Sequence, residues 1–205
     1  MDVLELKPIK NKKVIAYIFA KENSESLQYI DVELLTTFLK KEEIDFVIIN
    51  FDIDMKEFSK TPFAVIFEKL GIKYVQGDIP EYAMGYLYEE IIEKEELFNS
   101  LVDEYQNLKD RDSYKGQSLK NWIDLINSEI QEKENFLSLR LRPMWIVKKM
   151  LDFVKSFKAE EVKFVYLVQK DICEDICSQV VDLLRDFNVK VIQYNKKHLI
   201  KNIIL

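Results

Sequence analysis

Acidic and amide side chains directly follow the most apolar segments of the sequence, where they could converge on one site. Carboxylate oxygens are preferred ligands of Mg²⁺, and a bound Mg²⁺ could support hydrolysis of a phosphoester. The same residue types cap helices and close turns, which is the competing interpretation. The residues that could line this crevice are Glu22, Asn23, Asp52, Asp54, Asp78, Gln169 and Asp171.

The segment SKTP, residues 59–62, has the composition of a helix start that could bind an anion. Thr61 is a suitable N-cap, and Pro62 suits the first helical turn because its missing N–H would have no partner there. Free amide groups and the helix dipole attract anions at such an end. Ser59, Lys60 and Thr61 are therefore candidates for phosphate binding, with ordinary capping as the alternative.

Cys173 and Cys177 lie four residues apart at the start of an expected helix. Helical spacing places both on the face that packs on a sheet. Asp171 and Glu174 resemble a capping box at this helix start. A metal site would need further soft ligands, and His198 is the one histidine of the chain. We therefore expect two buried, structural, reduced cysteines and no resident metal or cofactor, with Mg²⁺ only in the hydrolase alternative.

Composition limits the classes of function. The net charge of -6 argues against nucleic acid as a partner, because binding to phosphates needs clustered Lys and Arg. Only four glycines occur, so the glycine-rich loops that cradle nucleotide phosphates are absent. No apolar run is long enough to span a membrane, and the first residues lack the pattern of a secretory signal. We expect a cytoplasmic protein.

Five apolar runs with the pattern of buried strands alternate with helical patterns. This alternation predicts an α/β fold, a Rossmann-like three-layer sandwich around a mostly parallel five-stranded sheet. With the strand order 3-2-1-4-5, the crevice would lie between the first and fourth strands. The expected strands are 13–20, 46–51, 73–77, 162–168 and 189–194, and the expected helices of the core are 27–41, 62–70, 143–157 and 172–187.

The connection between the third and fourth expected strands is far longer than one crossover helix requires. Apolar residues recur in it with alternating spacings of four and three, once on each side of a polar stretch at 109–117. This pattern predicts an inserted antiparallel helical hairpin, residues 84–140, in a core domain formed by residues 1–83 and 141–205. The predicted seam is Leu87, Ile91, Lys94, Phe98, Leu101, Tyr105 and Leu108, facing Leu119, Ile123, Ile126, Ile130, Lys133 and Leu137.

Two functional hypotheses follow. The first is a non-enzymatic interaction or regulatory module that self-associates or binds a protein partner through the hairpin, because catalytic motifs are missing and two helices bury only one seam between themselves. The second is a metal-dependent hydrolase or nucleotide-processing enzyme that uses the carboxylates at the strand ends. The residues expected to carry the interaction are Phe98, Leu101, Tyr105, Trp122, Ile126 and Ile130.

Overall fold

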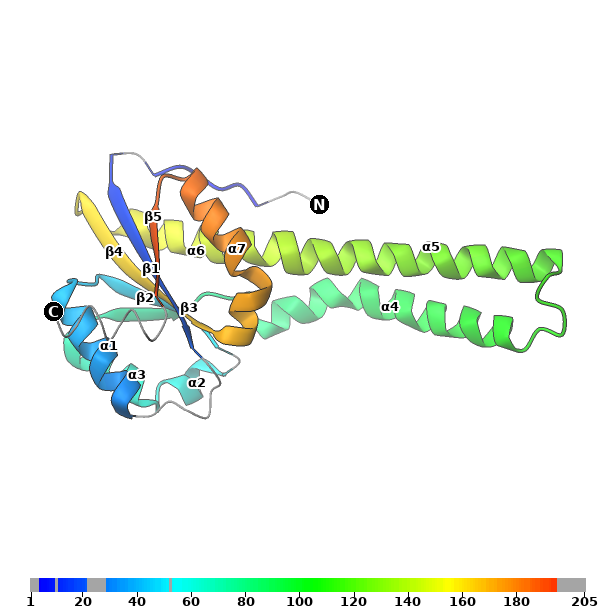
Figure 1. The fold of residues 1–205 in the computed structure, drawn as a ribbon, viewed down its shortest axis with the longest axis horizontal. Helices are drawn as coiled ribbons and strands as arrows, with labels where there is room; N and C mark the ends of the chain where they lie inside the picture. Colours follow the sequence, from blue (N-terminus) through cyan, green and yellow to red (C-terminus); the bar gives the residue numbers. More distant parts are fainter. Residues whose placement is uncertain (1–3, 10, 22–28, 52, 195–205) are drawn as a thin grey trace. The chain divides into compact units, whose positions relative to one another are not determined.

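The computed structural model describes residues 4–9, 11–21, 29–51 and 53–194, and it has an α/β fold with a five-stranded, all-parallel sheet (Figure 1). This confirms the predicted α/β class and the parallel strands. No helix among these residues has the length and apolar character needed to cross a membrane. The elements in chain order are β1 (Lys13–Lys21), α1 (Tyr29–Lys41), β2 (Phe46–Asn50), α2 (Met55–Phe58), α3 (Pro62–Leu70), β3 (Lys73–Gln76), α4 (Glu81–Gln106), α5 (Tyr114–Phe136), the π-helical turn η2 (Leu137–Leu141), α6 (Arg142–Ser156), β4 (Glu161–Gln169), α7 (Lys170–Asp186) and β5 (Lys190–Tyr194).

The strand order is β3-β2-β4-β1-β5, which differs from the order 3-2-1-4-5 that was considered in placing the crevice. β4 lies between β2 and β1, and it pairs with β1 along the full length of both strands, from Lys13 opposite Glu161 to Lys21 opposite Gln169. The two nine-residue strands therefore form the centre of the sheet, while the short strands β3 and β5 form its edges. The first and fourth strands are still neighbours, as the predicted crevice requires.

Alternate side chains of the strands form a hydrophobic core on each face of the sheet. On one face, residues such as Ile48 and Phe164 pack with buried side chains of α6 and α7. On the other face, Ile49 and Val165 pack with side chains of α1 and α3. Consecutive residues of one strand thus enter opposite cores, which explains why the central strands are apolar almost without interruption.

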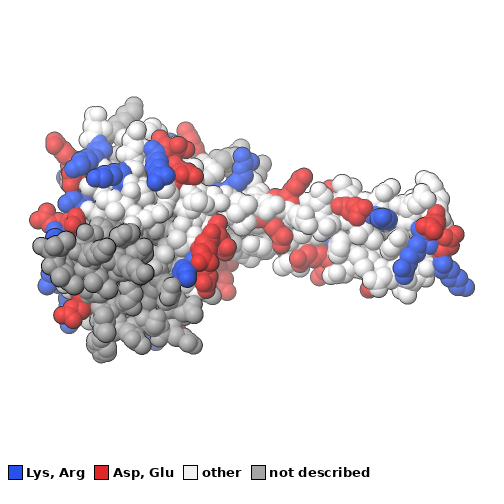
Figure 2. All heavy atoms as spheres, in the orientation of Figure 1, with Lys and Arg blue, Asp and Glu red and all other residues white. Residues whose placement is uncertain are grey.

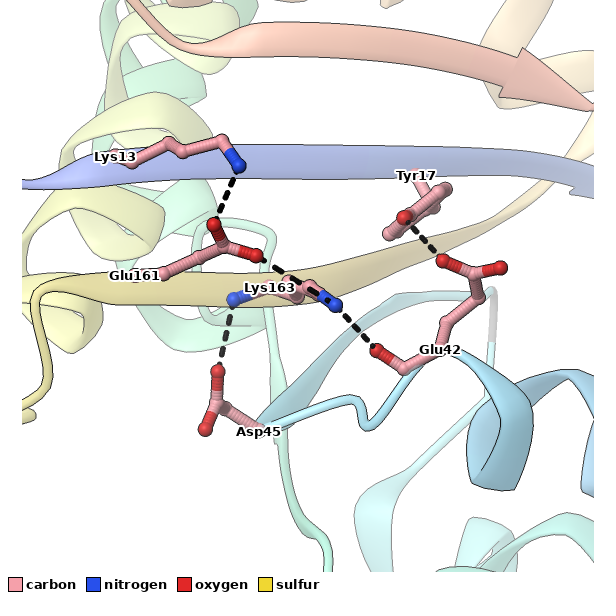
Figure 3. A network of polar contacts seen from close by, with 6 residues as sticks. All are labelled: Lys13, Tyr17, Glu42, Asp45, Glu161 and Lys163. Carbon is pink, nitrogen blue, oxygen red and sulfur yellow. Dashed lines mark hydrogen bonds and ion pairs between the residues drawn. The ribbon is translucent and has the colours of Figure 1, made fainter.

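A polar network ties the start of β2 to the amino ends of the central strands (Figure 3). Asp45 accepts a hydrogen bond from the Lys163 backbone N–H over 2.8 Å, and the Lys163 ammonium donates to the Glu42 carbonyl over 3.0 Å. The Tyr17 hydroxyl donates to the Glu42 carboxylate over 2.7 Å. These bonds fix the turn between α1 and β2, at the amino-terminal end of the strands, opposite the predicted crevice.

The chain divides into two compact units. The larger unit consists of residues 1–78 and 142–205 and contains the sheet. The smaller unit consists of residues 79–141 and contains α4, α5 and η2, and we call this whole unit the helix pair.

The helices of the pair run antiparallel and are joined by residues 107–113. Ser113 caps α5 by accepting a hydrogen bond from the Gly116 N–H. A side chain at Gly116 would collide with the backbone, because a Cβ there would lie 2.1 Å from the Arg111 carbonyl oxygen. Glycine is therefore required where the connection turns into α5.

Candidate functional site

A buried polar pair lies near the carboxyl ends of β2 and β4, the edge at which open parallel sheets carry ligand crevices. Asn50 is only 1% exposed, and its Nδ2 donates to the Tyr166 hydroxyl over 2.9 Å. The Oδ1 atom of Asn50 has no hydrogen-bond partner among the described residues. Burial raises the pKa of the Tyr166 phenol. The phenol therefore remains protonated and serves as a neutral hydrogen-bonding group.

Asp78 and Arg142 form a bidentate ion pair whose charges also act on the Tyr166 phenol. Arg142 Nε lies 3.0 Å from Asp78 Oδ1 and 2.9 Å from Oδ2, and a terminal guanidinium nitrogen lies 2.5 Å from Oδ2. Nearby, the Lys149 ammonium donates to the Gln76 carbonyl over 2.8 Å. Burial lowers the pKa of Lys149, while the Asp78 carboxylate opposes this change.

These groups form a polar cluster of Asn50, Gln76, Asp78, Arg142, Lys149 and Tyr166. The Asp78 carboxylate is engaged by Arg142, so the cluster holds no carboxylate poised as a general base. The Arg142 guanidinium neutralises and fixes that carboxylate, while the Lys149 ammonium donates to the Gln76 carbonyl and the Asn50 amide donates to the Tyr166 hydroxyl. The arrangement therefore orders the carboxyl ends of β2 and β3 and the first turns of α6.

The structure describes four of the seven predicted crevice residues, Asp54, Asp78, Gln169 and Asp171, and these four have separate surroundings. Asp54 caps the short helix α2 by accepting a hydrogen bond from the Lys56 N–H over 2.8 Å. Gln169 ends β4 and makes no side-chain capping bond to α7, and Asp171 is exposed in the first turn of that helix. The predicted residues that lie outside the described part of the chain are Glu22, Asn23 and Asp52.

Metal binding by these residues stays a prediction. Within the described ranges, no three His, Cys, Asp or Glu side chains gather in a way that could hold a metal ion. Asp78 is bonded to Arg142, and the Asp54 side chain accepts from a helix N-terminus. Glu22, Asn23 and Asp52 lie outside the described part of the chain, so the predicted Mg²⁺ site is not tested.

The predicted anion-binding residues make local capping bonds. Thr61 is the N-cap of α3, as predicted, and its hydroxyl accepts from the Ala64 N–H over 3.4 Å. The Thr61 and Ser59 hydroxyls donate to the carbonyls of Phe58 and Lys56, each over 2.7 Å. Ser59 is at the same time the C-cap of α2. The segment thus links two consecutive helices.

The two cysteines form a disulfide, Cys173–Cys177, so the prediction of reduced thiols is wrong. Their predicted placement is correct, because Cys177 is buried in the core between α7 and the sheet and Cys173 packs against that core. Four residues on one helix place both side chains on the same side of α7, where the sulfur atoms can meet. Sequence spacing was sufficient to place the pair, but not its oxidation state.

A hollow of about 610 Å³ lies at the opposite end of α6 from the polar cluster. The Asp152 carboxylate at this hollow has a lowered pKa, chiefly because Lys148 donates a hydrogen bond to it. Its position beside the first residue of β3 places it at the amino ends of the strands, away from the predicted crevice. The lining residues are Lys73, Asp152, Phe153, Ser156, Phe157 and Lys158.

In the helix pair, every residue of the predicted seam is buried or half-buried. Ile91 and Ile130 are buried in one cluster with Leu137. The lysines predicted within the seam make interhelical ion pairs, Lys94 with Glu129 and Lys133 with Glu90. The heptad spacing thus located the interhelical contact from sequence alone.

Most of the predicted interaction residues lie within this seam. Leu101 and Ile130 are buried, while Phe98, Tyr105 and Ile126 are half-buried. Phe98, Ile126 and Ile130 belong to the hydrophobic cluster between the two helices.

Trp122 is the exposed member of the predicted interaction set, and sequence reasoning missed its exposed companions. Leu97, Trp122 and Leu125 are 43%, 60% and 57% exposed, and we call these three residues the apolar patch. Leu97 lies seven residues before Glu104, and Trp122 lies seven residues after Lys115. Glu104 and Lys115 form an ion pair. The patch could have been identified from the sequence, because apolar residues stand here at a heptad position that holds paired charges elsewhere in the two helices.

Acidic residues dominate the helix pair, with basic side chains gathered around the connection between α4 and α5 (Figure 2). Residues 79–141 contain 14 Asp and Glu against 7 Lys and Arg, and the remainder of the chain contains 22 against 23. The helix pair therefore carries the negative charge of the chain.

No protein-family model, no curated protein and no solved structure matches the chain. The residues and contacts described above therefore carry the functional inference.

Proposed function

We propose that this protein is a non-enzymatic interaction or regulatory module of the cytoplasm, in which the helix pair binds a protein partner or a second copy. In this proposal the helix pair is an inserted, coiled-coil-like hairpin, and the larger unit is a Rossmann-like three-layer sandwich that carries it. The larger unit would supply stability and the helix pair would supply the binding surface.

The distribution of exposed apolar side chains is the observation that carries the proposal. Nine large hydrophobic residues are exposed in the described part of the chain, and all but Val65 belong to residues 79–141. Exposed apolar side chains that cluster on one unit are typical of a protein-binding surface. The members in residues 79–141 are Tyr82, Tyr86, Leu97, Tyr114, Trp122, Leu125 and Leu139, together with Ile92, which lies on the opposite flank of α4 from Leu97 and is not part of the proposed binding surface.

The composition of this set supports binding to a protein. Tyrosine and tryptophan are enriched at the centres of protein interfaces, because they bury a large area and lose little side-chain entropy. The helix pair has a hydrophobic cluster of its own around Ile91, Ile130 and Leu137. Its exposed residues are thus additional to those that hold the two helices together.

The proposal can be tested with the full chain and two variants. The double variant L97A/W122A removes most of the apolar patch, and I92A removes an exposed residue from the opposite flank of α4 as a matched control. Sedimentation velocity detects self-association, and quantitative affinity capture scores proteins that bind wild type and I92A but not L97A/W122A. A monomer at all concentrations, with the same captured proteins for all three forms, would contradict the proposal.

A further inference from the structure

A row of ion pairs runs along one side of the helix pair and is interrupted by apolar residues. On α4, Glu90, Leu97 and Glu104 are spaced by seven residues, and on α5 the same spacing joins Lys115, Trp122 and Glu129. Residues spaced by seven lie on one stripe of a helix. At one end the two stripes pair with each other, because Lys115 lies 2.7 Å from Glu104; at the other end Glu90 and Glu129 each pair with a seam lysine of the opposite helix, Lys133 and Lys94.

The interruption lies between these ion pairs. In an antiparallel pair of helices, the heptad spacing that brings Glu104 to Lys115 brings Leu97 to the level of Trp122. Leu125 follows Trp122 by three residues and extends the apolar surface on the same side. The apolar patch therefore occupies the place of one ion pair and has charged pairs on both sides.

This layout is that of a protein interface, in which an aromatic centre is surrounded by a polar rim. Tyr86, also exposed, precedes Leu97 by 11 residues, about 16 Å along the helix axis. Glu93 and Glu132 are exposed and lie one heptad from Tyr86 and Leu125. The surface thus offers an apolar stripe a few helical turns long with carboxylates along it.

The charge of the helix pair favours a different protein over a second copy of the chain as the binding partner. Two copies would bring together surfaces that each contain 14 acidic against 7 basic residues, and such surfaces repel each other at moderate ionic strength. Nucleic acids and anionic membranes are disfavoured for the same reason. A partner with Lys and Arg beside an apolar stripe is complementary in both respects.

We infer that the apolar patch and its acidic rim bind a basic amphipathic α-helix of another protein. Such a helix can lie along the two helices of the pair and complete a three-helix arrangement, with apolar residues at i, i+3/i+4 and i+7 on the patch and basic residues beside Glu93 and Glu132. This inference rests on the proposed function, and it names the chemistry of the partner.

A pair of synthetic peptides tests the inference with the full chain. The probe is a fluorescein-labelled 18-residue helix of Leu at i, i+3/i+4 and i+7 with Lys at the remaining positions, and the control replaces every Lys by Glu. Fluorescence anisotropy should detect binding of the Lys peptide alone, with affinity falling more than tenfold between 50 and 300 mM NaCl. The L97A/W122A variant should bind at least tenfold more weakly and E93K/E132K several-fold more weakly.

I92A is the matched control. Ile92 is exposed and lies about 100° from the Ile91 seam position, whereas Leu97 lies about 120° away in the opposite sense. I92A should bind the Lys peptide as tightly as wild type, and circular dichroism should show equal helix content in all variants. Equal weakening in I92A and L97A/W122A, or no binding of the Lys peptide, would overturn the inference.

Sedimentation velocity on the same proteins distinguishes failure of the proposed interaction function from failure of the inference about a basic partner helix. A dimer that L97A/W122A dissociates, with no binding of the Lys peptide, would support the proposed function and exclude a basic partner helix. No self-association and no peptide binding, together with no captured protein that depends on the patch, would remove both.

Discussion

Asp78 and Arg142 form an ion pair at the two positions where the chain leaves the larger unit and returns to it. Asp78 is the last residue before 79–141 and Arg142 is the first residue after, and the guanidinium meets both carboxylate oxygens. The pair joins residues 64 positions apart in sequence. It therefore fixes the distance between the ends of the segment that carries the helix pair.

We expect D78N and R142M each to destabilise the larger unit by about 2–4 kcal/mol, because each leaves the other member of a largely buried ion pair without its partner. The double variant should recover part of this loss. Urea unfolding of the four proteins, followed by circular dichroism, gives the coupling energy. Additive losses in the double variant would show that the two side chains act independently.

The bond between Asn50 and Tyr166 makes a second prediction. Y166F leaves the Asn50 side chain with neither of its polar atoms paired in a fully buried position, at a cost of about 1–3 kcal/mol. Y17F is the matched control, because the Tyr17 hydroxyl bonds to Glu42 in a part-buried site. Urea unfolding at pH 8 should show the larger loss for Y166F. Equal losses would mean that burial of the Asn50 amide adds nothing.

The raised pKa of Tyr166 predicts a pH dependence. The unfolded chain releases the phenol proton near pH 10, while the buried phenol keeps it, so the stability from this group is complete below pH 10 and falls as pH rises through the interval up to the folded pKa. Y166F has no phenol at this position and therefore lacks this pH-dependent contribution to stability. The stability gap between wild type and Y166F should therefore shrink by about 1.4 kcal/mol between pH 8 and pH 11. A constant gap would contradict burial of a neutral phenol.

The disulfide within α7 should contribute little to stability. It links residues only four apart, so it restrains a short segment of the unfolded chain, and its loss should cost at most about 2 kcal/mol. Mass spectrometry after alkylation with iodoacetamide should show two adducts only when the protein is first reduced and unfolded. Two adducts without reduction would contradict the bond.

The sequence predicted the elements well because their signals are local. The apolar runs gave all five strands to within one residue at each end, and Thr61 and Pro62 marked the start of α3 correctly. The seam of the helix pair followed from heptad spacing, since burial between two helices depends on a repeat within each one.

The strand order was not predictable from the same patterns. β1 and β4 are both nine residues long and buried on both faces, so their hydrophobicity does not distinguish which one lies beside β2. The polar cluster was missed for a related reason. Asn50 and Tyr166 are 116 residues apart and lie within apolar strands, so only the β2–β4 pairing brings them together.

The apolar patch permits a test that separates folding from binding. The double variant L97E/W122K would continue the row of ion pairs through the patch, because these positions lie one heptad from the pair formed by Glu104 and Lys115. An exposed ion pair contributes at most about 1 kcal/mol, and the apolar side chains it replaces are themselves largely exposed. Thermal unfolding should therefore change little, whereas binding of the Lys peptide should be lost. A large fall in stability would show instead that Leu97 and Trp122 are needed to hold the two helices together.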